Sequence, residues 1–253
     1  MIETLFLVLA GFAAGLLAGM FGIGGGILLV PSMVMLFSIP IKEAIGTSLL
    51  VIIPTAAFGF IKHMERRGAN LQIVFILIAG GMLGAYAGAL ATGVVNSQTL
   101  ELLFQFFIIV ISAVMLIRRK NLIKMQEDCS NLKLNSFRFV VLFSGSFLIG
   151  ILSGLLGVGG GTLLVPFLVI YLRMPLRQAI AYSLLAIFFN ALSGVFAHIS
   201  LGNVNFEIAL YLLLGSIGGV QLGSSFSKKI PEEKLHVLAA VFFILVALSL
   251  SLK

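Results

Sequence analysis

The sequence predicts an all-α polytopic membrane protein that is built from two related copies of one unit. Hydrophobic residues make up 60% of its 253 residues and charged residues only 10%, whereas a soluble domain carries about 25% charge. The apolar residues fall in runs of roughly 18 or more, which is the length that a helix needs to cross a bilayer. An internal repeat is the third observation, and it divides the chain in two.

The repeat is clearest around two glycine-rich segments. GLLAGMFGIGGGILLVP begins at Gly15, and GILSGLLGVGGGTLLVP begins at Gly150, 135 residues later (150 − 15). When Gly15–His63 is aligned with Gly150–His198, 22 of the 49 positions are identical, whereas this composition would give about 5 by chance. The sequence therefore predicts a first transmembrane repeat, a connector and a second transmembrane repeat, at residues 1–117, 118–138 and 139–253.

Each copy divides into the same predicted elements. It begins with an apolar region that the glycine-rich segment interrupts, and three uninterrupted spans follow. The interrupted regions lie at about 4–38 and 139–172, and the spans at about 43–61, 71–93 and 98–117 and at about 178–197, 206–226 and 233–251. The polar stretch RRKNLIKMQEDCSNLKLNSFR, at 118–138, joins the copies.

The interrupted region can cross the membrane in three ways. Residues 27–38 would make about 18 Å of helix, which is too short for a hydrocarbon core of about 30 Å. The region could return as a re-entrant hairpin, cross twice as two short helices with help from tilt, or cross once as a single broken helix. The first two arrangements bring the chain back to the side from which it started.

The distribution of Lys and Arg favours such a return. If each copy crosses an odd number of times, 14 of the 16 Lys and Arg residues lie on one face, leaving Lys42 and Lys253 on the other. A single broken helix would reduce this split to 10 against 6. The positive-inside rule therefore predicts a cytoplasmic connector and both termini outside. An odd number of crossings also makes the two copies inverted, as in many secondary transporters.

Composition argues against several other classes of protein. The single cysteine, Cys129, provides no internal disulfide and no thiolate metal framework, so we expect neither a metal site nor a cofactor. The cations lie between apolar segments, where they orient helices and meet lipid headgroups, and nucleic acid is not an expected partner. The only aspartate, Asp128, lies in the connector, and no GxSG serine occurs. We therefore expect no enzyme.

The doubled glycine runs are the strongest candidates for a binding site. GIGGG at 22–26 and GVGGG at 157–161 fit neither the GxGxxG nor the GxxxxGK[ST] nucleotide motif. A helix that begins at such a break points free N–H groups and the positive end of its dipole inward, which favours an anion. Close helix packing through small residues is the alternative. The predicted anion-binding glycines are Gly24, Gly25, Gly26, Gly159, Gly160 and Gly161.

Hydroxyl side chains are predicted to complete this site. Two positions that inverted symmetry relates can approach each other only near the membrane midplane. Ser48 and Ser183 lie roughly 6 Å along the helix from the centres of their spans, and Thr47, Tyr182 and Thr162 are expected to support them. Hydrogen bonding of the hydroxyls back to their own helices is an equally common alternative.

A few other polar residues lie in or near the spans. Inversion places His63 and His198 at opposite membrane ends, so we expect interfacial anchors, with pH gating as the alternative. Glu101 and Glu207, near the outer ends of their spans, are weaker candidates for proton coupling. Gln105 and Asn190 are expected to form hydrogen bonds between helices, with ligand contact as the alternative.

These motifs resemble the sulfite exporter TauE/SafE family, also called the toluene sulfonate uptake permeases. The resemblance covers essentially the whole chain. It rests on GxGGGxxxxP at Gly22–Pro31 and Gly157–Pro166, on the stretches AIGTSLL and AIAYSLL, and on the pairs His63/Asn70 and His198/Asn205. It implies a plasma-membrane transporter for small sulfur-containing anions such as sulfite or organosulfonates. The second copy has Tyr182 where the first has Thr47, so the two sides of any binding site are chemically unequal.

The residues themselves favour a similar function, a secondary transporter that carries a small anion through a midplane site by alternating access. In a cell whose interior is negative by about 100 mV, a monovalent anion gains about 2.3 kcal/mol on leaving, so export needs no coupling ion. A passive anion channel is the nearer alternative, and a membrane-embedded factor without transport activity is the more distant one. The expected partners are the anion and the lipid bilayer, and a homodimer is left open.

Overall fold

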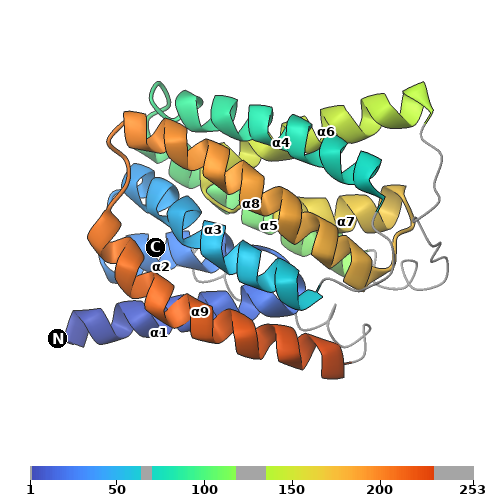
Figure 1. Cartoon of the computed structure of the whole chain (residues 1–253). Coiled ribbons are helices and arrows are strands. Elements are labelled where there is room, and N and C mark those ends of the chain that lie inside the picture. The colour runs from blue at the N-terminus through green and yellow to red at the C-terminus, as the bar shows by residue number, and fades with distance from the viewer. Residues whose placement is uncertain (1, 64–69, 118–134, 231–253) are drawn as a thin grey trace.

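The computed structural model describes residues 2–63, 70–117 and 135–230, and every regular element in these ranges is a helix (Figure 1). This confirms the predicted all-α class. The third span expected in the second copy and most of the connector, including Cys129, lie outside the described residues. The helices are α1 (Ile2–Phe21), α2 (Gly26–Leu36), α3 (Ile41–His63), α4 (Leu71–Ala91), α5 (Ser97–Ile117), α6 (Ser136–Leu156), α7 (Gly161–Tyr171), α8 (Leu176–Ser200) and α9 (Phe206–Lys229).

Within the described ranges, α1, α3, α4, α6, α8 and α9 are long and apolar enough to cross a membrane. Their outward faces carry large apolar side chains, among them Phe75, Leu148 and Phe196, which are 68%, 61% and 63% exposed. Apolar surface of this extent requires lipid rather than water around it. The chain is therefore a multi-pass membrane protein.

The two copies adopt the same backbone where the helices are interrupted. α1 ends at Phe21 and α6 at Leu156, and the chain then follows a left-handed path that glycine adopts without steric cost. The φ angles are 69°, 79° and 82° at Gly22, Gly24 and Gly25, and 69°, 75° and 79° at Gly157, Gly159 and Gly160. The repeat in the sequence is thus also a repeat in the backbone.

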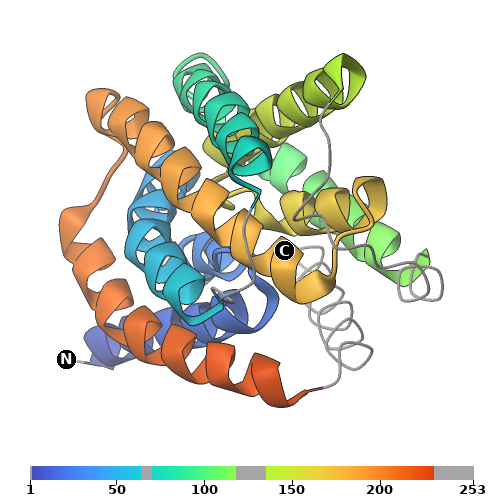
Figure 2. The same ribbon diagram turned by 45° about the vertical axis from the view of Figure 1, so that its right-hand side comes forward.

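On either side of a central pair of helices, a helix of one copy packs along a helix of the other copy. α1 of the first copy packs along α9 of the second, and α6 of the second packs along α4 of the first, with α3 and α8 between them (Figures 1 and 2). A β-carbon on Gly15 would collide with the backbone of Ser216, and one on Gly84 with the backbone of Phe147. Small residues therefore let these helices approach closely, as is usual in membranes.

The central helices α3 and α8 run antiparallel. Gly46, near the start of α3, lies against His198 near the end of α8, and Gly59, near the end of α3, lies against Leu184 near the start of α8. The helices that the repeat makes equivalent thus cross the core in opposite directions.

The glycine-interrupted region enters the core and turns back. Gly19, near the end of α1, is hydrogen-bonded by His63 at the end of α3, whereas Gly24 lies against Ile52 in the middle of α3. From there α2 leads back to Ile41, where α3 begins. The predicted interruption is confirmed. α1 and α2 together form a hairpin, and α6 and α7 form the equivalent hairpin in the second copy.

Candidate functional site

The two glycine-rich loops meet back to back in the core. A β-carbon on Gly26 would collide with the backbone of Gly157, and one on Gly161 would collide with the backbone of Gly22. Only residues without a side chain permit this approach. The structure therefore brings the predicted glycines of both copies together in one place.

Two isoleucine side chains pack against both glycine-rich loops where the loops meet. A β-carbon on Gly24 would stand 3.3 Å from a methyl group of Ile187 and 3.4 Å from one of Ile52, and Gly159 lies against the same two side chains. Ile52 and Ile187 are equivalent in the repeat, and both are fully buried. The loops thus face apolar side chains contributed by the middles of α3 and α8.

Each loop also presents unpaired hydrogen-bond donors. Among the described residues, the N–H groups of residues 23–27 and 158–162 donate no backbone hydrogen bond, and the pairing resumes at Leu28 and Leu163. Gly25 and Gly160 cap α2 and α7 without any side-chain hydrogen bond. Two helix starts with free donors and positive dipole ends therefore lie in the core, where they favour a negative charge.

The predicted serines bind the loop of the opposite copy. Ser48 Oγ lies 2.7 Å from the carbonyl oxygen of Gly157 and 2.7 Å from that of Ile45 in its own helix. The equivalent Ser183 Oγ lies 3.1 Å from the carbonyl oxygen of Gly22. A hydroxyl has one proton to donate, so each serine shares it between its own helix and the other copy. These hydroxyls hold the loops in position.

Thr47 and Tyr182 contact the starts of other helices. Thr47 Oγ1 accepts a hydrogen bond from the backbone N–H of Asn205 at 2.9 Å, and the Tyr182 hydroxyl accepts one from that of Asn70 at 2.6 Å. The two asparagines cap α9 and α4. The structure thus pairs Thr47 and Tyr182 with caps of the other copy and not with each other.

Two hydroxyls beside the second loop have no hydrogen-bond partner among residues 2–63, 70–117 and 135–230. Thr162 Oγ1, in the first turn of α7, and Ser153 Oγ, in the last turn of α6, are both fully buried. Ser153 Oγ lies 3.6 Å from the point where a β-carbon on Gly160 would stand. Thr162 is one of the predicted site residues, whereas Ser153 is not, although it is a polar residue in an otherwise apolar stretch.

The two histidines tie helices together inside the protein. His63 and His198 are 5% and 0% exposed. Their Nε2 atoms lie 2.8 Å and 3.0 Å from the carbonyl oxygens of Gly19 and Gly154, near the ends of α1 and α6. The expected interfacial anchoring is therefore wrong, because both rings contact protein backbone instead of the membrane surface.

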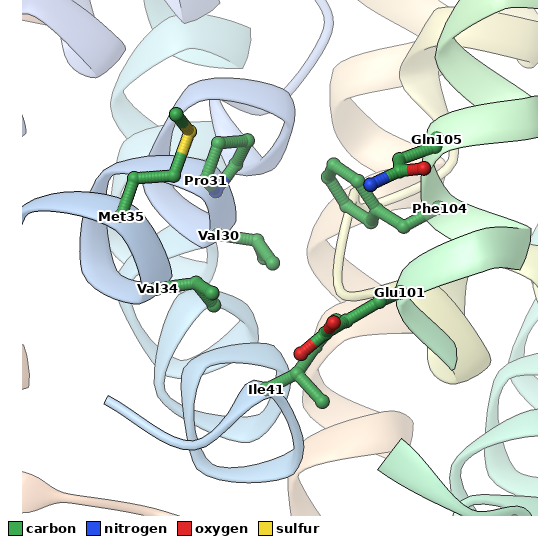
Figure 3. Close-up of a pocket in the computed structure, with 8 residues that line it drawn as sticks. All are labelled: Val30, Pro31, Val34, Met35, Ile41, Glu101, Phe104 and Gln105. Atoms are coloured by element: carbon green, nitrogen blue, oxygen red, sulfur yellow. The ribbon is translucent and has the colours of Figure 1, made fainter. Parts of the chain in front are cut away.

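A separate pocket of about 260 Å³ lies between α2, α5 and the start of α3 (Figure 3). Glu101 and Gln105, one turn apart on α5, line it together with apolar side chains of α2. Gln105 therefore faces a cavity. Asn190 packs against Gly81, and its Oδ1 has no hydrogen-bond partner among the described residues. Among the residues that the structure describes, no three His, Cys, Asp or Glu side chains gather into a group that could hold a metal ion.

Comparison with known proteins identifies the family of this chain. The model of the family described as "Sulfite exporter TauE/SafE" matches residues 7–250. "Probable membrane transporter protein YunE" of Bacillus subtilis is 30% identical over 261 residues, which are 96% of this chain and 96% of that protein. A "Probable membrane transporter protein" of Haemophilus influenzae is 29% identical, over 98% of each chain. No solved structure matches the chain. The chain belongs to the sulfite exporter TauE/SafE family of membrane transporters.

Proposed function

We propose that this protein is a secondary transporter that moves a small sulfur-containing anion, such as sulfite or an organosulfonate, across the plasma membrane. The meeting of two glycine-rich loops from different copies carries the proposal, because each loop precedes a helix that begins with unpaired N–H groups. Such donors bind an oxyanion without a fixed cation. Capture is then weak enough for the anion to be released on the other side.

Alternating access is the mechanism that best suits two copies arranged in this way. The antiparallel course of α3 and α8 supports an inverted relationship between the copies. In transporters built from inverted repeats, the binding site lies between the repeats and opens to each side in turn. The buried pair Ile52 and Ile187 would then cover the site while it is closed to both sides.

Export is the direction that the membrane potential supports. A monovalent anion gains about 2.3 kcal/mol per 100 mV on leaving a cell with a negative interior. We place both termini outside and the 118–138 connector in the cytoplasm, on the ground of the predicted Lys and Arg distribution. The anion would then leave from the face that carries most of the positive charge, where it is attracted before it binds.

Counterflow in liposomes tests the proposal against its nearest alternative, a passive anion channel. The purified full-length protein is reconstituted into liposomes that are loaded with unlabelled sulfite and diluted into a trace of radiolabelled sulfite. A carrier accumulates the label transiently, and its flux saturates as the sulfite concentration rises. Flux that neither saturates nor supports accumulation would show a channel, and no flux of sulfite or of any organosulfonate tested would overturn the proposal.

A further inference from the structure

The two copies differ in polarity beside their glycine-rich loops. In the last turn of the helix before the loop, the second copy has Ser153 where the first has Ala18. In the first turn of the short helix after the loop, the second copy has Thr162 where the first has Ile27. The loops share one backbone conformation, so the fold does not require a hydroxyl at either position.

Both hydroxyls are fully buried and have no hydrogen-bond partner among the residues that the structure describes. Native proteins keep few such groups, because an unpaired buried hydroxyl is destabilising. A serine or threonine in a helix can bond a carbonyl of the preceding turn, as Thr55 bonds Val51 at 3.0 Å. In the described part of the chain, Ser153 and Thr162 make no such bond, so their hydroxyls can serve a partner from outside the chain.

These hydroxyls lie around the start of one helix. Ser153 Oγ lies 3.6 Å from the position that a β-carbon on Gly160 would take, and Gly160 is the N-cap of α7. Thr162 is the second residue of α7. The N–H groups of residues 158–162 donate no backbone hydrogen bond in the described part of the chain. The start of α7 thus combines amide and hydroxyl donors with the positive end of a helix dipole.

We infer that Ser153 and Thr162 donate hydrogen bonds to the transported anion at the start of α7, so that the second copy supplies the main part of the binding site. This inference rests on the proposed function and states which half of the site carries the binding. The donors suit a small oxyanion, because its oxygen atoms accept several hydrogen bonds at once. The first copy has Ala18 and Ile27 in the same places and offers only backbone donors.

The test uses the full-length variants Ser153→Ala and Thr162→Val, each purified in detergent. Binding of radiolabelled sulfite is measured by equilibrium dialysis, and the melting temperature is measured without any anion. We expect each variant to raise the Kd by about ten-fold or more, as is typical when a hydrogen bond to a charged ligand is lost. The melting temperature without anion should stay the same or rise, because each substitution removes an unpaired buried hydroxyl.

Two control variants remove hydroxyls that are already bonded within their own helices. Thr55→Val is matched to Thr162→Val, since Thr55 Oγ1 bonds the carbonyl oxygens of Val51 and Ile52. Ser144→Ala is matched to Ser153→Ala, since Ser144 Oγ bonds the carbonyl oxygen of Val140 on the same helix, α6, at 2.7 Å. Neither control should change the affinity for sulfite.

Three outcomes would overturn the inference, and they have different meanings. If the unmodified protein binds sulfite and both site variants bind it with unchanged Kd, the hydroxyls do not bind the anion. If binding and melting temperature fall together, the hydroxyls are structural. If the unmodified protein binds neither sulfite nor any organosulfonate tested, the proposed function itself fails, and this inference falls with it.

Discussion

The hydroxyl oxygen of Tyr182 lies 2.6 Å from the backbone nitrogen of Asn70 and accepts its hydrogen. Tyr182 lies in the second turn of α8 in the second copy, whereas Asn70 caps α4 in the first. Thr47 and Asn205, the equivalent pair with the copies exchanged, form the same bond at 2.9 Å. Two side chains of different length thus make the same kind of contact in the two copies, and each contact joins a central helix to the other copy.

Removal of the Tyr182 hydroxyl should weaken this junction. Tyr182→Phe leaves the ring in place but deprives the Asn70 N–H of its acceptor, and we expect a loss of about 1 kcal/mol in stability. The melting temperature of the purified protein measures it. Tyr86→Phe is the control, because Tyr86 is 46% exposed on α4 and its variant should melt as the unmodified protein does. Equal melting temperatures for the two variants would contradict this role of Tyr182.

The serine bonds to the opposite loops should affect both stability and transport. Ser48→Ala removes the donor to the buried carbonyl of Gly157, so we expect lower stability, by about 1–3 kcal/mol, and slower counterflow. Ser183→Ala should have the smaller effect, because its bond to Gly22 is 3.1 Å long and that of Ser48 is 2.7 Å. Counterflow at the normal rate in Ser48→Ala would show that transport does not depend on this bond.

A β-carbon in the glycine loops should reduce anion binding. Gly25 and Gly160 have φ angles of 82° and 79°, where a side chain strains the backbone by about 1–2 kcal/mol. Gly160→Ala is the cleaner variant, since its β-carbon would stand 3.2 Å from the Ile149 side chain, whereas that of Gly25→Ala would stand 2.9 Å from the carbonyl oxygen of Ala14. We expect about ten-fold weaker sulfite binding or more in each, with folded protein still in the membrane.

The packing alternative for these glycines makes a different forecast. If the loops serve only to let helices approach, expression and melting temperature should fall in proportion to transport. Measurement of the melting temperature beside the Kd therefore separates the two interpretations. Normal affinity and rate in either alanine variant would remove the basis for placing the anion at the loops.

Two neighbouring glycines of α9 test the exchange of helices between the copies. A β-carbon on Gly219 would collide with the backbone of Phe12 in α1, whereas the nearest atom to one on Gly218 is 3.8 Å away on the Phe12 ring. Gly219→Ala should therefore greatly lower the yield of folded protein in size-exclusion chromatography. Gly218→Ala should be tolerated or slightly stabilising, because alanine favours helix over glycine by about 0.8–1 kcal/mol. A normal yield from Gly219→Ala would argue against the α1–α9 contact.

Cys129, the only thiol, provides a direct test of topology. The predicted concentration of Lys and Arg on one face places the 118–138 connector in the cytoplasm. A membrane-impermeant maleimide should therefore label Cys129 only after the cells are permeabilised, with labelling followed by a gel shift. Labelling in intact cells would reverse the predicted orientation.

The sequence allows the elements to be predicted well but not their partners. Glycine runs break helices locally, so the breaks after Phe21 and Leu156 can be predicted from the residues that surround them. The spans, however, are apolar on nearly every face, and such a pattern does not indicate which face meets which neighbour. Gly84 and Gly219 are visible as small residues, but their contacts with α6 and α1 are long-range and need the structure.

The candidate site could be predicted to a similar degree. Ser48 is recognisable as a buried hydroxyl, but its partner, the carbonyl of Gly157, lies in the other copy. Thr47 and Tyr182 have polar partners at helix caps, which no periodic pattern indicates. Ser153 does not stand out among the identities between the two copies, because the equivalent residue of the first copy is Ala18. Comparing the copies for differences in polarity would have found it.

The exchange of helices also limits how this molecule can change shape. The glycine contacts bind α1 to α9 and α4 to α6 backbone to backbone, so a motion that preserves them must carry each pair as one rigid body. Each such body contains a helix from both copies, and the boundary between moving parts therefore does not follow the boundary between the repeats. That boundary runs instead along α3 and α8, the two helices that lie between the pairs.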